Sequence, residues 1–234
     1  RKMIEIILLV SSALFIFALK LFGRPSSAHR ANTFAMLAMG LAIFSAFNFD
    51  FSKYDSTFYI TIVVSGLLGV LISKRVQMTQ MPELVGLFNG FGGGASGAIA
   101  YVELSGSSIP ISDVSVAIFS MVIGMFTFSG SLVAVMKLRG KLNNFSKKLA
   151  DIFSVFLPTI IIIPAVLEMD DLLIEFIILV ALIAGVIRVA VIGGADMPVV
   201  IAFLNSLSGI AAMSAGFIVT VSYTHLTLPT KVTV

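Results

Sequence analysis

The feature that most restricts the fold of this chain is a series of about eight long apolar segments separated by short polar loops. Hydrophobic residues make up 58% of the chain and charged residues only 12%, whereas soluble domains usually carry about a quarter charged residues. A chain that crosses a bilayer must satisfy its backbone hydrogen bonds internally, and helices of about 20 residues do so across the hydrocarbon core. We therefore predict an all-α fold, a polytopic bundle of transmembrane helices in a lipid bilayer.

The predicted spans are residues 3–22, 32–47, 57–73, 82–102, 112–136, 149–167, 172–192 and 198–220. The loops after the first, third and fifth spans are rich in Lys and Arg, and the loops between these are mainly acidic. Cytoplasmic loops of membrane proteins are enriched in Lys and Arg. The alternation predicts a multi-pass protein with cytoplasmic odd-numbered loops and an N-terminus outside.

Two of the predicted helices share a sequence pattern. The dipeptide Met-Pro at 81–82 begins eight residues before Asn89, and the same dipeptide at 197–198 begins eight residues before Asn205. Proline fits the first turn of a helix, and eight residues then place each amide about 12 Å inside a hydrocarbon core about 30 Å thick. Polar side chains at that depth often mark a pathway. The alternative for each Asn is an interhelical hydrogen bond worth about 0.6–2 kcal/mol.

Small residues in two predicted helices indicate close helix packing. Gly90 and Gly94 form one Gly-x-x-x-Gly pair, and Gly93 and Gly97 form another, a spacing that lets helix backbones approach closely. In the next helix we predict that Ser131 supplies a hydroxyl to a pore. The alternative is that such a serine bonds back to its own helix.

Motifs for catalysis and for metal or nucleotide binding are missing from the sequence. No Gly-x-Gly-x-x-Gly follows a predicted strand, and the glycine run at 92–94 falls inside an apolar helix, so we do not expect it to bind phosphate. No carboxylate pair, nucleophile–base pair or Cys/His cluster has a suitable spacing. The net charge of +3 comes from short loops, where topology explains it. We predict no catalytic residue, no metal, no cofactor bound by this chain and no nucleic-acid partner.

Four runs of the sequence carry a family resemblance: residues 78–85 (MTQMPELV), 89–94 (NGFGGG), 127–131 (TFSGS) and 193–200 (GGADMPVV). Through them, about residues 1–220 resemble the membrane domain of the beta subunit of proton-translocating NAD(P)⁺ transhydrogenase. The resemblance implies an enzyme complex of the bacterial inner membrane that couples hydride transfer from NADH to NADP⁺ to proton flow. It also implies an alpha subunit with the NAD(H) domain and further helices, and a soluble NADP(H)-binding domain after the beta-subunit helices.

The same resemblance gives roles to the polar residues. It implies a proton pathway at Asn89, Asn205 and Ser131, and a cytoplasmic mouth at Glu83 and Asp196 that meets the NADP(H) domain. Proton occupancy in the bundle would bias how tightly that domain holds NADP(H). Many family members carry a His at the position of Asn89, and a neutral amide does not titrate. The titrating group is therefore expected on a partner helix.

Two other functions fit the same residues. One is a secondary transporter, in which the repeated Met-Pro pattern surrounds a polar substrate site at mid-membrane. The other is a purely structural membrane subunit.

The chain departs from the family pattern after about residue 220. Residues 221–234 resemble the read-through of a sequencing adapter, and we expect them to be a non-native tail after a transmembrane proton-channel domain at residues 1–220. The NADP(H)-binding domain would then be absent by truncation. This chain alone would not transfer hydride.

Overall fold

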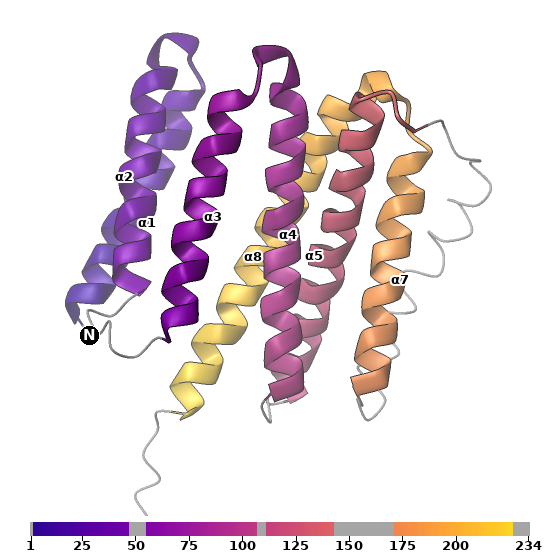
Figure 1. Ribbon diagram of the computed structural model, residues 1–234. Helices are drawn as coiled ribbons and strands as arrows, with labels where there is room; N and C mark the ends of the chain where they lie inside the picture. Colours follow the sequence, from indigo (N-terminus) through magenta and orange to yellow (C-terminus); the bar gives the residue numbers. More distant parts are fainter. Residues whose placement is uncertain (1, 47–54, 107–110, 143–170, 227–234) are drawn as a thin grey trace, which may run out of the picture. The chain divides into compact units, whose positions relative to one another are not determined.

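The computed structural model describes residues 2–46, 55–106, 111–142 and 171–226, and within these ranges the chain is helical with no strand. The α-helices in chain order are α1 (Lys2–Phe22), α2 (Ala28–Ala46), α3 (Ser56–Arg75), α4 (Met81–Gly106), α5 (Ile111–Leu138), α7 (Asp171–Ala190) and α8 (Met197–Leu226) (Figure 1). The predicted all-α class is confirmed. The described helices number seven rather than about eight, because the predicted span at 149–167 lies outside the described residues.

Five of these helical segments are long and apolar enough to cross a membrane: Met3–Phe22, Ser56–Arg75, Asp113–Leu138, Asp171–Ala190 and Gly194–Val219. The helices α2 and α4 are not among the five, because both contain many small and polar residues that lower their hydropathy. These features fit a helical membrane bundle. The backbone of α8 remains helical to Leu226, beyond the predicted boundary at residue 220.

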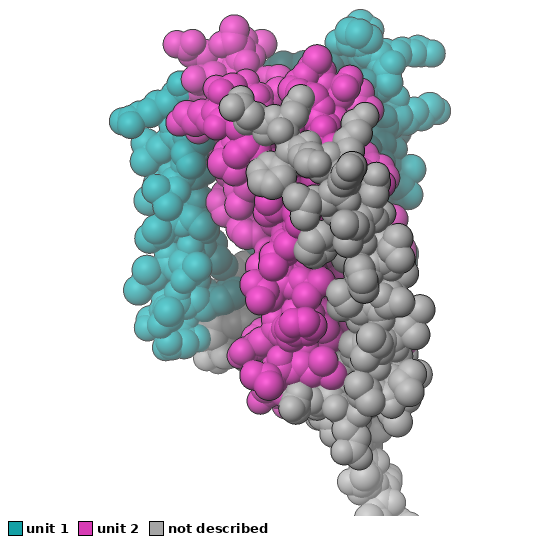
Figure 2. Space-filling view, turned by 90° about the vertical axis from the view of Figure 1, so that its right-hand side faces the viewer, with its two compact units in different colours: residues 1–75 teal, residues 76–234 magenta. Residues whose placement is uncertain are grey.

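The chain divides into two compact units, residues 1–75 and residues 76–234 (Figure 2). In the first unit α1 and α2 pack against each other and are joined by a short 3-10 turn, η1 (Pro25–Ser27). The hydroxyl of Ser11 donates a hydrogen bond of 2.7 Å to the backbone carbonyl of Ala38 across this pair. The rings of Phe17 and Phe34 meet edge to face, with centroids 5.1 Å apart.

In the second unit α5 is the central helix, since it packs against α4, α7 and α8, while α4 also packs against α8. Glycine allows the closest of these contacts. A Cβ atom added to Gly124 of α5 would lie 2.5 Å from the carbonyl oxygen of Gly93 and 2.7 Å from the amide nitrogen of Gly97, both on α4. On the opposite side of α5, a Cβ atom on Gly185 of α7 would overlap the Ser129 hydroxyl.

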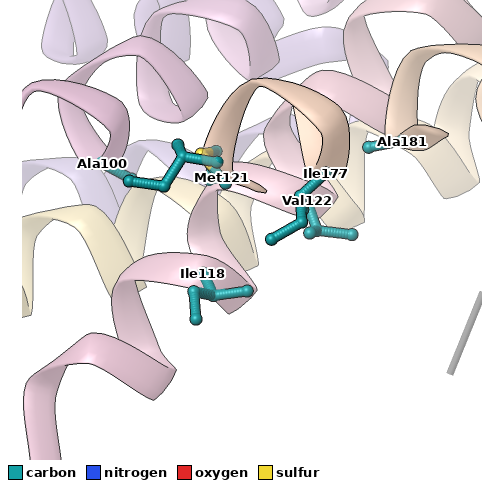
Figure 3. Packing of buried hydrophobic residues seen from close by; sticks show 7 residues of the cluster. Ala100, Ile118, Met121, Val122, Ile177 and Ala181 are labelled. Atoms are coloured by element: carbon teal, nitrogen blue, oxygen red, sulfur yellow. The ribbon is translucent and has the colours of Figure 1, made fainter. Parts of the chain in front are cut away.

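Two apolar clusters pack this unit. The first joins α4, the beginning of α5 and α7, and contains Ala100, Ile118, Met121, Val122, Ile174, Ile177 and Ala181 (Figure 3). The second joins the end of α5 to the end of α7 and the beginning of α8, and contains Val133, Ala134, Val189, Ala190, Met197, Ile201 and Leu204. Ser131, which makes a polar contact with α4, lies between these two clusters along α5.

Both Met-Pro helices begin in the same way. A 3-10 turn precedes each one, η3 (Met78–Gln80) before α4 and η5 (Gly194–Asp196) before α8. The methionine is the first residue of each α-helix and proline the second, where its missing N–H costs little. The N–H of Met81 donates to the carbonyl of Met78, and the N–H of Met197 donates to the carbonyl of Gly194. The sequence repeat therefore has a structural counterpart at the helix starts.

Candidate functional site

The candidate site is a polar contact among α4, α5 and α8. The side-chain nitrogen Nδ2 of Asn89 donates a hydrogen bond of 2.9 Å to the hydroxyl oxygen of Ser131. From α8, the hydroxyl of Ser208 donates to the backbone carbonyl oxygen of Asn89 at 3.3 Å. Asn89 is 7% exposed and Ser131 is fully buried. Asn89 thus contacts two residues that follow it in the sequence by 42 and 119 positions.

A glycine next to Asn89 makes this contact possible. A Cβ atom on Gly90 would lie 3.2 Å from Cβ of Ser131 and 3.4 Å from the carbonyl oxygen of Phe128. Since Gly90 has no side chain, α5 approaches α4 closely enough for the short Ser131 side chain to reach the Asn89 amide. The glycines singled out in the sequence all lie against α5, where Gly94 faces the Phe128 ring and Gly97 faces Met125.

One polar atom of the site has no partner in the structure. The side-chain oxygen Oδ1 of Asn89 is buried and accepts no hydrogen bond. Exchanging the nitrogen and oxygen of the amide, which is an assignment made from hydrogen bonding, would let Oδ1 accept from Ser131 but would leave Nδ2 unpaired instead. An unpaired buried polar atom costs about 1–3 kcal/mol. Asn89 therefore has spare hydrogen-bonding capacity inside the bundle, although neither its amide nor the serine hydroxyls can hold a charge near neutral pH.

Asn205 lies outside this cluster. Its side chain is exposed on α8, whereas Leu204 is buried and Ser208 faces Asn89. The two copies of the repeat thus differ in burial. In the first copy Met81 is 41% exposed and Asn89 is buried. In the second copy Met197 is fully buried and Asn205 is exposed. Helix geometry allows the Met and the Asn of one copy to differ in burial, because eight residues at 3.6 per turn rotate the helix about 80° beyond two full turns. A methionine and an asparagine at this spacing point in different directions.

The two acidic residues predicted at the mouth lie at the starts of the Met-Pro helices. Glu83, in the first turn of α4, accepts a hydrogen bond of 2.6 Å at Oε2 from Nε of Arg139, which follows α5. Asp196 ends the η5 turn, and its side chain is exposed. An acidic residue in a first turn also interacts favourably with the helix dipole.

Three residues of this region were not predicted from the sequence: Ser208, Lys137 and Arg139. The predicted span 112–136 ends directly before Lys137, but Lys137 belongs to the last turn of α5 and is only 5% exposed. Its Nζ donates to the carbonyl oxygens of Ala190 and Ile192, at 2.5 Å each. A spacing of three or four residues from Gly130 through Val133 to Lys137 places them on one helix face. That spacing is the sequence signal that would have indicated burial.

Two features of the described residues bear on nucleotide and metal binding. The glycine run at 92–94 is helical, so its N–H groups lie in the helix hydrogen-bonding pattern rather than in a phosphate loop. Gly93 and Gly94 are also packed against α5. Among the side chains that the structure describes, no group of three or more His, Cys, Asp or Glu residues could hold a metal ion. What the site offers is a chain of uncharged hydrogen-bonding groups.

Comparison with known proteins identifies relatives over most of the chain. The model of the family described as NAD(P) transhydrogenase beta subunit matches residues 4–227. Two curated relatives from Rhodospirillum rubrum, both called NAD(P) transhydrogenase subunit beta, are each 32% identical over 223 residues, covering 89% of this chain and 48% of the relative. The chain thus spans about half the length of the curated relatives it matches. These matches confirm the family resemblance carried by the motifs.

Proposed function

This chain belongs to the NAD(P) transhydrogenase beta subunit family, and from this premise we propose that its helices form the part of the complex that couples proton flow to hydride transfer from NADH to NADP⁺. The observation that supports the proposal is the hydrogen bonding of the buried Asn89 with the buried Ser131 and the half-buried Ser208 among apolar helices. Buried polar groups at membrane depth are costly and commonly functional.

In this proposal the cluster passes protons along hydrogen bonds and another group binds them. The spare acceptor of Asn89 and the Ser131 hydroxyl each offer a place where a water or a protonated group can hydrogen-bond. The titrating group comes from a helix of the partner alpha subunit, because an amide and a hydroxyl do not titrate near neutral pH. The exposed side of α8 that carries Asn205 is the surface we assign to that contact.

The proposed route ends at the starts of α4 and α8. Glu83 and Asp196 lie there, and we assign them to the mouth that faces the NADP(H)-binding domain of the complete subunit. Proton occupancy would then change the affinity of that domain for NADP(H), which is a coupling free energy between two distant sites. NADP(H) and NAD(H) bind elsewhere in the complex, since the glycines at 92–94 are part of a packed helix.

The experiment that tests the proposal compares two buried serines of α5 in the complete beta subunit assembled with its partner in liposomes. Ser131 bonds to Asn89, whereas Ser120 donates to the carbonyl of Ala211 on α8 at 2.9 Å. We expect Ser131→Ala to slow transhydrogenation driven by a proton gradient, and Ser120→Ala to leave it near the wild-type rate per assembled complex. Equal rates for both variants would contradict a pathway at Asn89 and Ser131.

The orientation is a second part of the proposal. The alternating loop charges support an orientation with the starts of α4 and α8 in the cytoplasm and the N-terminus outside the inner membrane. Reporter fusions after Lys148 should then be cytoplasmic, and fusions after Asp171 external. The reverse pattern would place Glu83 and Asp196 on the wrong side for a contact with the NADP(H)-binding domain.

The secondary transporter is disfavoured by helix continuity. Transporter sites at mid-membrane commonly use interrupted helices. In contrast, α4 is a continuous helix of 26 residues around Asn89, and α8 is a continuous helix of 30 residues around Asn205.

A further inference from the structure

The end of α5 contacts the regions where both Met-Pro helices begin. Lys137 donates to the carbonyls of Ala190 and Ile192, in the segment that leads into η5 and α8. Arg139, two residues later, pairs with Glu83 in the first turn of α4. A single short segment, Lys137-Leu138-Arg139, thus reaches toward both copies of the repeat.

Lys137 of α5 caps the C-terminal end of the neighbouring helix α7. The last four carbonyls of a helix have no partner within that helix, and a cation at this end is favoured by the helix dipole. Lys137 supplies charged donors to the end of α7, and hydrogen bonds to charged groups are stronger than those between neutral groups. Because Lys137 is 5% exposed, losing its ammonium would leave carbonyls unpaired in a poorly hydrated place.

The cap lies a few residues before the start of α8. The η5 turn starts two residues after Ile192 and ends directly before Met197. Met197 is fully buried and packs in the same cluster as Val133 and Ala134, which lie one turn before Lys137 on α5. The start of α8 is therefore packed on α5 through Met197, and the segment that leads into it is bound to α5 by the Lys137 hydrogen bonds.

The Arg139 contact is more exposed. The Arg139 side chain is half exposed, while the Glu83 carboxylate is mostly covered. A pair of this kind contributes little to stability, but its position matters because Glu83 belongs to the first turn of α4. Asn89 lies six residues further along the same helix.

We propose that Lys137 and Arg139 are positioning residues that hold the starts of α8 and α4 on the end of α5, and thereby keep Asn89, Ser131 and Ser208 in contact. Ser131 and Lys137 belong to one uninterrupted helix and are about 9 Å apart along its axis at 1.5 Å per residue. A change at the mouth is then transmitted to the polar cluster by movement of a rigid helix. The consequence for proton coupling rests on the function proposed above, whereas the positioning itself does not.

The test uses spin labels, because this chain contains no cysteine. Labels at Met78 and Ala195, exposed residues of the two 3-10 turns, report the distance between the helix starts in the assembled complex, with any cysteines outside this chain replaced. We expect a narrow distance distribution in the wild type and a broad one in Lys137→Met. Lys137→Arg, which keeps a charged donor, should restore the narrow distribution, and Lys141→Met, which removes an exposed charge nearby, should leave it unchanged.

The Glu83 pair provides a second, milder test. Arg139→Glu should broaden the same distribution, and the double variant Glu83→Arg with Arg139→Glu should narrow it again. Unchanged distributions in Lys137→Met and Arg139→Glu would overturn the proposal, and if Lys137→Met does not assemble, the Arg139 series decides alone. Failure of the proposed function is a separate result, because Ser131→Ala could retain wild-type coupling while Lys137→Met still broadens the distances.

Discussion

At the scale of single residues, Asn89 combines burial with an unused hydrogen-bonding atom. Its amide is held by Ser131, its backbone carbonyl is bonded by Ser208, and Oδ1 has no partner. A side chain whose only purpose is to hold helices together would be expected to have both amide atoms paired, because each unpaired buried atom costs free energy. The spare atom therefore favours a role in a pathway over one in packing alone.

Substitutions at Asn89 should separate hydrogen bonding from charge. In the full complex, Asn89→Gln keeps the amide and should reduce the proton-coupled rate only modestly. Asn89→Asp introduces a group that can gain or lose a proton, so the pH dependence of the rate should change as well as its size. The measurement is the coupled rate against pH in liposomes, normalised to assembled complex. A wild-type rate and pH profile in Asn89→Ala would show that Asn89 serves helix packing and not the proton pathway.

At the scale of helices, the contact between α4 and α5 depends on glycine at positions where a methyl group has no room. Gly124→Ala would place Cβ against the backbone of Gly93 and Gly97, which cannot move aside as a flexible side chain could. Forcing extra volume into a packed interface typically costs about 1–3 kcal/mol. We expect Gly124→Ala to lower the thermal stability of the purified protein and to weaken the Asn89–Ser131 contact.

The matched control for this prediction is Gly92→Ala on α4, where an added Cβ would meet no atom within 4 Å. Alanine has the higher helix propensity, by about 1 kcal/mol over glycine, so this variant should be as stable as the wild type or more so. Thermal unfolding followed by circular dichroism in detergent gives both values. Equal stability of the two variants would show that the α4–α5 interface can expand.

A pH effect is expected at the start of α3. Asp55 precedes this helix and accepts a hydrogen bond of 2.8 Å from the hydroxyl of Thr57. This bond, with further donors from the backbone of Ser56 and Thr57, lowers the pKa of the Asp55 carboxyl below its usual value. A lowered pKa means that the carboxylate stabilises the folded helix start at pH above the pKa of the unfolded chain. That contribution disappears as pH falls through the pKa of the folded state.

Hydrogen exchange at the backbone amides of the first turn of α3 measures this effect. Corrected for the intrinsic pH dependence of exchange, protection in the wild type should decrease as the carboxylate is protonated. Asp55→Ala should show lower protection and no such decrease. A wild-type profile that stays flat through acid pH would contradict the role of Asp55 as a cap.

The sequence predicted where the helices begin better than it predicted which face of each helix is buried. Proline at 82 and 198 marks a first helical turn because its missing N–H costs least there, and both helices begin one residue earlier, at methionine. Which side of a helix is buried depends on its neighbours, so a repeat read along the sequence could not show that Asn89 is buried and Asn205 exposed. The burial of Lys137 was missed because a charged residue near a helix end normally reaches water.

At the scale of the whole molecule, the exposed polar side of α8 is a surface that a partner can cover. Asn205 and Ser206 are exposed in the middle part of a helix that is long and apolar enough to cross a membrane. An amide facing lipid at that depth is expensive. Because beta subunits of this family belong to a multisubunit complex, a partner helix can supply the contact that the described helices of α8's own unit do not.

The final prediction concerns Asn205 in that assembly. Asn205→Leu keeps a similar volume and removes the amide, so it should preserve the apolar contact of α8 with its neighbours while removing hydrogen bonds to a partner helix. In the complete subunit with its alpha partner, we expect proton-coupled transhydrogenation to fall much more than the amount of assembled complex, measured by co-purification. The matched variant Phe203→Leu changes another exposed residue of α8 without removing a polar group, and should affect neither quantity strongly. If Asn205→Leu assembles fully and pumps protons normally, the amide serves neither the pathway nor the interface. If it instead reduces assembly and coupling in equal proportion, Asn205 holds the subunits together and the proton pathway is limited to the buried cluster at Asn89.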